Sequence, residues 1–182
     1  YPVYNAAYSS HAGDWDAFIM KFNPSGSRQW ASYYGGAGED NHVREGGVAA
    51  DAQGNVVISG YTLSSNLPML NAYQSSKGGG SDAFFAKFST SGALQWATYY
   101  GGTDQDHVAD LCYIRNQHIY WVGYSNSSNY PTSNPLQSTN AGGWDVTVGR
   151  LTQHGVPVWS SYYGGSSDDL GFGIDYRSSV VA

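Results

Sequence analysis

The chain contains an internal repeat, and this repeat limits the folds that it can adopt. A tryptophan followed by Tyr-Tyr-Gly-Gly occurs in three places, which read QWASYYGG (29–36), QWATYYGG (95–102) and VWSSYYGG (158–165). The first two tryptophans are 66 residues apart and the last two are 63 apart. A fixed period is typical of proteins in which each repeat is one supersecondary unit that buries its apolar surface against its neighbours.

Each repeat contains short segments with strand character. Residues 16–22 alternate, with Phe18, Met20 and Phe22 on one face, and this two-residue period is typical of a strand. The segment Asp-Ala-Gln-Gly-Asn (51–55) predicts a hairpin turn. No sustained helical periodicity is present. We therefore expect an all-β protein, and in the first repeat we expect strands at 16–22, 28–34, 43–51 and 55–62.

Four antiparallel strands per repeat predict the blade of a β-propeller. About three blades are represented, and a ring of 4–8 blades would need further blades or other copies of the chain. The chain is therefore expected to be cut from a longer polypeptide or to be completed by another segment. The polar stretches 62–81 and 125–144 are expected to be exposed loops. The predicted units are the tail of a preceding blade (1–15), a first repeat (16–81), a second (82–144) and a partial third (145–182).

The repeat motif also resembles a known family. The run DAFIMKFNPSGSRQWASYYGG, followed by GVAADAQGNVVISGYT, resembles the bacterial β-propeller repeat called SBBP. The resemblance covers nearly the whole chain and is closest in the first copy. The second copy departs from the pattern at 111–118 and the third at 146–149. The resemblance implies a propeller of several blades in a secreted or surface protein, and it implies no defined catalytic activity.

Composition excludes several classes of protein. The formal net charge is -6, with 8 Lys+Arg against 14 Asp+Glu, so binding to nucleic acid by electrostatic attraction is not expected. No apolar run reaches the roughly 18 residues that a membrane helix needs. Cys112 is the single cysteine, so no intrachain disulfide can form.

An acidic residue follows each Gly-Gly pair in the same register. Two interpretations are open for these residues. Calcium prefers oxygen ligands from carboxylates and carbonyls, so calcium is the one cofactor to consider. A turn in which each carboxylate accepts backbone N–H groups is favoured, because one carboxylate per repeat is few for a metal. The residues are Asp40, Asp106 and Asp169.

Two other positions are filled in the same way in every repeat and are expected to be structural. One is the tryptophan of the Tyr-Tyr-Gly-Gly motif, expected in the core or between blades. The other is a basic residue, expected to form an ion pair with one of the two repeated aspartates, at 40/106/169 or 16/82/145. A basic ring facing the propeller channel is the alternative. The residues are Trp30, Trp96 and Trp159, and Lys21, Lys87 and Arg150.

Two further tryptophans are candidates for ligand binding. Trp15 and Trp144 both precede the first aspartate of a repeat, beside a Gly-rich loop, where the second repeat has Ser81. Aromatic faces on loops stack on the apolar C–H surface of sugars, while Asp and Asn bond the hydroxyls. Packing over the end of the blade is the alternative.

These observations favour a non-catalytic, extracellular scaffold or adhesion module, secreted or at the cell surface, with polysaccharide as its ligand. Its partners would be further blades, other copies of the chain, or glycan. One alternative is a structural subunit of a surface assembly or filament formed by blade-to-blade pairing. Another is a hydrolase or lyase carried on a propeller. That enzyme would need a carboxylate pair or a His-centred group at non-repeated positions, for which Glu45, Asp104, Asp110 and Asp175 are available.

Overall fold

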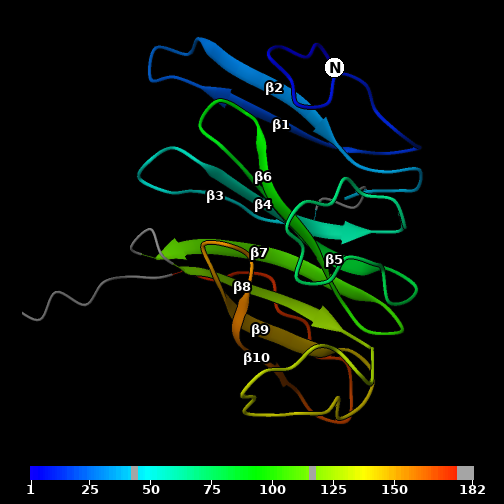
Figure 1. Ribbon diagram of the computed structural model, residues 1–182. Coiled ribbons are helices and arrows are strands. Elements are labelled where there is room, and N and C mark those ends of the chain that lie inside the picture. Colours follow the sequence, from blue (N-terminus) through cyan, green and yellow to red (C-terminus); the bar gives the residue numbers. More distant parts are fainter. Residues whose placement is uncertain (42–44, 115–117, 176–182) are drawn as a thin grey trace, which may run out of the picture.

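The computed structural model describes residues 1–41, 45–114 and 118–175 (Figure 1). Over this part of the chain there are ten strands and no helix, so none that could cross a membrane. The prediction of an all-β protein is confirmed, with strands at all four places expected in the first repeat. The strands are β1 (Ala17–Phe22), β2 (Arg28–Tyr34), β3 (Val48–Ala50), β4 (Val56–Thr62), β5 (Asp82–Phe88), β6 (Leu94–Tyr100), β7 (Asp106–Ile114), β8 (His118–Ser125), β9 (Asp145–Thr152) and β10 (Pro157–Tyr163).

The strands form three antiparallel sheets stacked on one another (Figure 1). β1 pairs with β2, β3 to β6 form a four-stranded meander, and β7 to β10 form a second one. Each four-stranded sheet takes two strands from one sequence repeat and two from the next. Sheets and repeats are therefore offset by half a period, and the described sheets do not close into a ring. The part of the third repeat from residue 176 lies outside the described residues.

The chain passes between sheets by returning from a last strand to a first strand. It leaves β6 and enters β7, which packs against β3, β4 and β5 of the preceding sheet. β3 and β7 thus lie together on one side of the stack. β6 and β10 are the edge strands on the other side.

The long polar loops cover these edge strands. In the β4–β5 loop, the carbonyls of Leu70 and Gln74 accept hydrogen bonds from Ala97 N (2.9 Å) and Tyr99 N (3.1 Å) of β6. The β8–β9 loop makes the same two bonds to β10. The unpaired backbone groups of an edge strand can template aggregation, and these hydrogen bonds give partners to such groups in β6 and β10. As predicted, these segments are loops with many exposed side chains, and in addition the backbone of each loop forms two isolated bridges to an edge strand.

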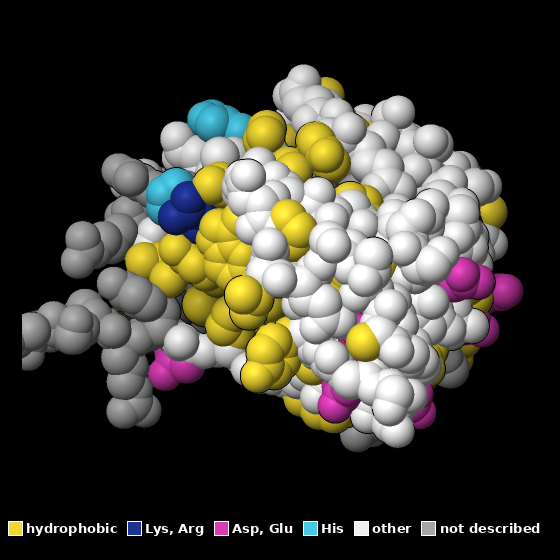
Figure 2. All heavy atoms as spheres, turned by 90° about the horizontal axis from the view of Figure 1, so that it is seen from below, with side chains coloured by type: hydrophobic (Ala, Val, Ile, Leu, Met, Phe, Trp, Pro, Cys, Tyr) yellow, Lys and Arg dark blue, Asp and Glu magenta, His cyan; other side chains and the backbone are white. Residues whose placement is uncertain are grey.

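Aromatic side chains dominate the core between the sheets. Trp121 contacts Phe85 and Tyr100 edge to face, with ring centroids 5.3 Å away in both cases. Of the repeated tryptophans, Trp30 is 1% exposed and Trp96 is 4% exposed. Trp159, in the last sheet, is half-buried. Hydrophobic side chains also gather on the outer face at the β10 end of the stack (Figure 2).

Candidate functional site

After each Gly-Gly pair, an aspartate accepts hydrogen bonds at the point where the chain leaves one sheet. Asp106, at the start of β7, is fully buried. Its carboxylate accepts hydrogen bonds from Gly102 N (2.7 Å), from Ser127 Oγ (2.9 Å) and from the Ser125 hydroxyl. Asp40 makes the equivalent bonds to Gly36 N, Ser64 and Thr62, and Asp169 accepts from Gly165 N.

A second carboxylate meets each of these turns, and a glycine separates the two. A Cβ added to Gly101 would lie 2.7 Å from Asp106 Oδ2 and 2.7 Å from Asp82 Cγ. Asp82 is fully buried and accepts from Gly78 N (2.8 Å) and Gln74 Nε2 (2.9 Å). No side chain fits at this position, which explains the first glycine of the motif. Gly35 and Gly164 stand between Asp16 and Asp40 and between Asp145 and Asp169 in the same way.

Burial disfavours the charged form of three of these carboxyl groups, those of Asp40, Asp82 and Asp106. It raises the pKa of Asp106 to about 6, although hydrogen bonds from Ser125, Gly102 and Ser127 oppose the rise. The nearby charge of Asp82 adds to it. Burial also raises the pKa of Asp40 and of Asp82.

The arrangement does not fit the calcium interpretation. The oxygens of Asp106 and Asp40 face hydroxyl and amide donors, whereas a calcium ion needs oxygen acceptors around it. Within residues 1–41, 45–114 and 118–175, no three His, Cys, Asp or Glu side chains gather as metal ligands. The hydrogen-bonded turn describes what the structure shows at this position.

The repeated basic residues do not pair with the repeated aspartates as predicted. Lys87 lies 3.3 Å from Asp51 in the β3–β4 turn, and both side chains are buried. Burial raises the pKa of Asp51, but hydrogen bonds from Asn55 and the Lys87 charge outweigh it and lower the pKa. The prediction is wrong because Lys87 lies five residues along β5 from Asp82, about 16 Å away at strand spacing. Lys21 instead donates to Gly54 O (2.8 Å), and the Arg150 guanidinium lies 6.0 Å from the centre of the Tyr120 ring.

The two candidate ligand-binding tryptophans have different surroundings. Trp15 is 56% exposed, and the neighbouring Asp14 is also exposed. Trp144 is half-buried and packs edge-on against Tyr124 (5.2 Å) and His107 (5.7 Å). Trp15 is therefore the more exposed of the two, while Trp144 contributes to packing between strands.

His107 is the centre of a cluster that sequence reasoning did not assemble. His107 Nδ1 lies 2.7 Å from Glu45 Oε2, and its Nε2 lies 3.1 Å from Ser81 Oγ. The Tyr61 ring stacks on the imidazole at 4.6 Å, nearly parallel. Tyr124 donates its hydroxyl to Glu45, and burial and this contact raise the Tyr124 pKa. Tyr61 lies in β4, and Glu45 and Ser81 lie just before β3 and β5 of the same sheet. His107 and Tyr124 lie in β7 and β8 of the next sheet.

The order serine, histidine, carboxylate is that of a hydrolytic triad. Ser81 is only 4% exposed, so the hydroxyl is held mainly inside the protein. The signal in the sequence was Ser81, which stands where the other two repeats have Trp15 and Trp144. Of the other non-repeated carboxylates, Asp110 accepts a hydrogen bond from Ile174 N (3.1 Å) instead.

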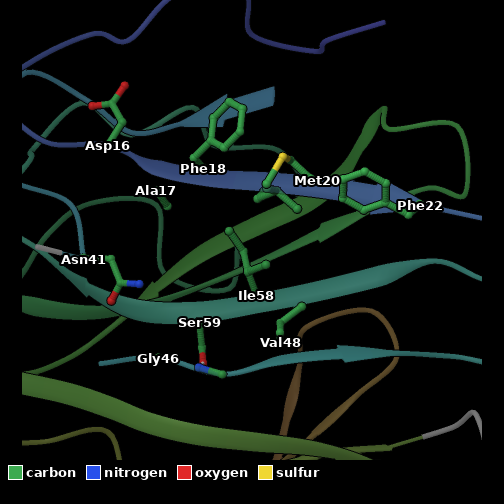
Figure 3. A pocket seen from close by; sticks show the side chains of 12 residues that line it. Asp16, Ala17, Phe18, Met20, Phe22, Asn41, Gly46, Val48, Ile58 and Ser59 are labelled. Carbon is green, nitrogen blue, oxygen red and sulfur yellow. The ribbon is translucent and has the colours of Figure 1, made fainter. Parts of the chain in front are cut away.

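A groove of about 440 Å³ lies between β1 and the next sheet (Figure 3). Phe18, Met20 and Phe22 line it from β1, and Val48 and Ile58 line it from β3 and β4. Both β5 and β9 pair with a strand on each side, whereas β1 pairs with β2 alone among the described strands. Met20 and Phe22 are each 52% exposed as a result.

Comparison with known proteins found no family model that matches the chain and no matching curated protein.

The raised pKa of Asp106 predicts how this one group contributes to the pH dependence of stability. Because the folded state holds a proton that the unfolded chain, with a carboxyl pKa near 4, releases more readily, the contribution of Asp106 to stability is fully present below pH 4 and is lost as the pH rises through about 6. Urea unfolding at pH 4, 5, 6 and 7 measures the free energy of unfolding. Replacement Asp106→Asn should flatten this pH dependence by about 2 kcal/mol. An unchanged slope in the variant would contradict the assignment.

Proposed function

We propose that the chain is part of a β-propeller of the bacterial SBBP type and serves as a non-catalytic, extracellular scaffold or adhesion module. The observation that carries this proposal is the passage between sheets. Two four-stranded meanders follow one another, and the first strand of the second packs against the first strands of the preceding sheet. Strand order and crossover of this kind are those of consecutive propeller blades.

The hydrogen bonds of the buried aspartates support the proposed scaffold function. Each repeat uses its polar residues to hold turns and loops: Asp106 binds its own crossover, and Asp82 binds the β4–β5 loop through Gln74 and Gly78. Their hydrogen-bonding capacity is directed inward. Location outside the cell rests on the resemblance to the repeat family and on the low content of charged residues, 12%.

Polysaccharide is the ligand that we propose for this module, and Trp15 is its contact. Its exposed indole can stack on a sugar ring, and the neighbouring Asp14 can accept hydrogen bonds from hydroxyl groups. Trp144 occupies the equivalent position in the third repeat but is used for packing, so we assign it a supporting role.

Replacement Trp15→Ala should weaken retention on an insoluble polysaccharide about tenfold, a loss of ~1.4 kcal/mol. Cosedimentation with cellulose, chitin and peptidoglycan measures retention. Tyr73→Ala is the matched control, because Tyr73 is 53% exposed on a different loop. Equal retention of both variants, or no retention of the wild-type chain on any of the three, would contradict the proposal.

A second candidate function is ester hydrolysis, and the Ser81–His107–Glu45 geometry favours it. In this reaction Ser81 Oγ would attack the acyl carbon of an ester, and its proton would pass to His107 Nε2. The bond from the acyl carbon to the alcohol oxygen would break as the alcohol takes that proton, and water would then release the acyl group from Ser81 as a carboxylic acid. Glu45 would stabilise the charged imidazole.

A fluorophosphonate probe distinguishes the two functions. If Ser81 is a nucleophile, mass spectrometry finds a phosphonyl group on Ser81, and His107→Asn slows its formation at least about 100-fold. Ser76→Ala, at an exposed serine, is the control. Absence of labelling, or labelling that His107→Asn does not slow, rejects the hydrolase.

A further inference from the structure

One contact between neighbouring sheets involves a tryptophan and a hairpin glycine. The Trp30 indole of the first sheet lies on Gly92, in the β5–β6 turn of the second sheet. A Cβ added to Gly92 would lie 2.9 Å from the indole ring. Trp30 Nε1 donates to the carbonyl of Thr90 in the same turn, at 3.1 Å. Only glycine lets the indole approach so closely.

The same contact recurs between the second and third sheets. A Cβ on Gly155, in the β9–β10 turn, would lie 2.7 Å from the Trp96 ring. Trp96 Nε1 donates to Gln153 O at 2.8 Å. In both cases the tryptophan belongs to the earlier sheet and the glycine to the later one, so the contact has a direction. Both glycines are buried.

One tryptophan and one turn of this kind are left without a partner among the described residues. Trp159 is half-buried and packs edge-on against Tyr120 of its own sheet at 6.3 Å, but within the described residues its indole has no hairpin turn of another sheet against it. Gly26, in the β1–β2 turn, is exposed and has open space where a Cβ would be. Among the three described sheets, this tryptophan lies on the last and this turn on the first.

The turn at Gly26 already has the shape that the other two have when occupied. Gly26 has φ +79°, compared with +89° for Gly92 and +77° for Gly155. Gly26 N donates to Asn23 O at 2.9 Å, the bond that Gly92 N makes to Ser89 O. The carbonyl of Pro24 stands where Thr90 and Gln153 accept from an indole. The acceptor is therefore formed before any partner arrives.

A tyrosine repeats the same direction. Tyr34 and Tyr100 are fully buried and donate their hydroxyls to Pro68 O (3.0 Å) and Pro131 O (2.8 Å) in the next sheet. Tyr163, the equivalent residue of the last sheet, is 65% exposed. Tyr163 is the last residue of β10. Strand β10 belongs to the last sheet of the stack, where hydrophobic side chains gather on the outer face (Figure 2).

We propose that copies of this chain associate head to tail, with Trp159 of one copy on the Gly26 turn of the next. Trp159 Nε1 then donates to Pro24 O, as Trp30 and Trp96 do within the chain. The contact is heterologous, since it joins two different surfaces, and it builds a ring or an open stack according to the rotation per copy. The inference rests on the sheet stacking proposed above and extends it to contacts between molecules.

Two variants block the opposite halves of this contact. Trp159→Ala removes the donor and keeps the turn. Gly26→Asn keeps the left-handed backbone, which Asn tolerates, and places a Cβ where the indole must lie. Leu136→Ala is the control, because it removes an 85% exposed hydrophobic side chain from the last sheet without touching either half.

Light scattering over a range of concentrations tests the proposal. The wild-type chain and Leu136→Ala should exceed 19.6 kDa increasingly with concentration, and each blocking variant should weaken association at least about tenfold. An equimolar mixture of Trp159→Ala and Gly26→Asn should form a one-to-one dimer, because one intact donor meets one intact turn. A wild-type monomer at all concentrations, association that survives either block, or a mixture that stays monomeric would each overturn it.

A stability measurement separates this failure from a failure of the stacking itself. Trp96→Ala removes the contact within the chain and should lower the midpoint of urea unfolding far more than Leu136→Ala. If it does so while the wild-type chain stays monomeric, stacking within the chain stands and head-to-tail association is rejected. If the two midpoints are equal, both are rejected.

Discussion

A buried carboxylate at each crossover is the constraint on which the rest of the structure depends. Asp106 joins the end of one sheet, through Gly102 N, to the end of β8, through Ser125 and Ser127. Its charge has no basic partner in this turn, so neutral donors must surround it in a fixed geometry. The same set of bonds holds both described crossovers, from β2 to β3 at Asp40 and from β6 to β7 at Asp106.

This constraint explains why several other features recur together. The second aspartate, Asp82, approaches the same turn and can do so only across a glycine, Gly101. Asp82 in turn holds the β4–β5 loop through Gln74, and Gln74 O pairs with the edge strand β6. Loop, edge and crossover are thus one connected hydrogen-bonded unit. Apolar packing and the tryptophan–glycine contact then set the distance from one unit to the next.

Much of the fold could be predicted because it depends on local patterns. Strand alternation, Gly turns and the fixed period gave every strand of the first repeat. The offset between sheets and repeats could not be read from the period, since a period does not say which neighbours pair. The ion pair of Lys87 was missed because its partner, Asp51, lies in the β3–β4 turn, far from Lys87 in the sequence. The His107 cluster was missed because Glu45 and Ser81 come from distant segments, although the exchange of a repeated tryptophan for Ser81 marked the place.

The most direct test places alanine at two glycines of the repeated Gly-Gly motif whose surroundings differ, Gly101 in the second repeat and Gly165 in the third. A Cβ at Gly101 would enter the space between Asp82 and Asp106, whereas a Cβ at Gly165 would meet only Asp169 Oδ2, at 3.8 Å. Urea unfolding should show that Gly101→Ala lowers the free energy of unfolding by about 2–4 kcal/mol and Gly165→Ala by less than about 1 kcal/mol. Equal losses in the two variants would contradict the claim that the paired carboxylates hold the crossover.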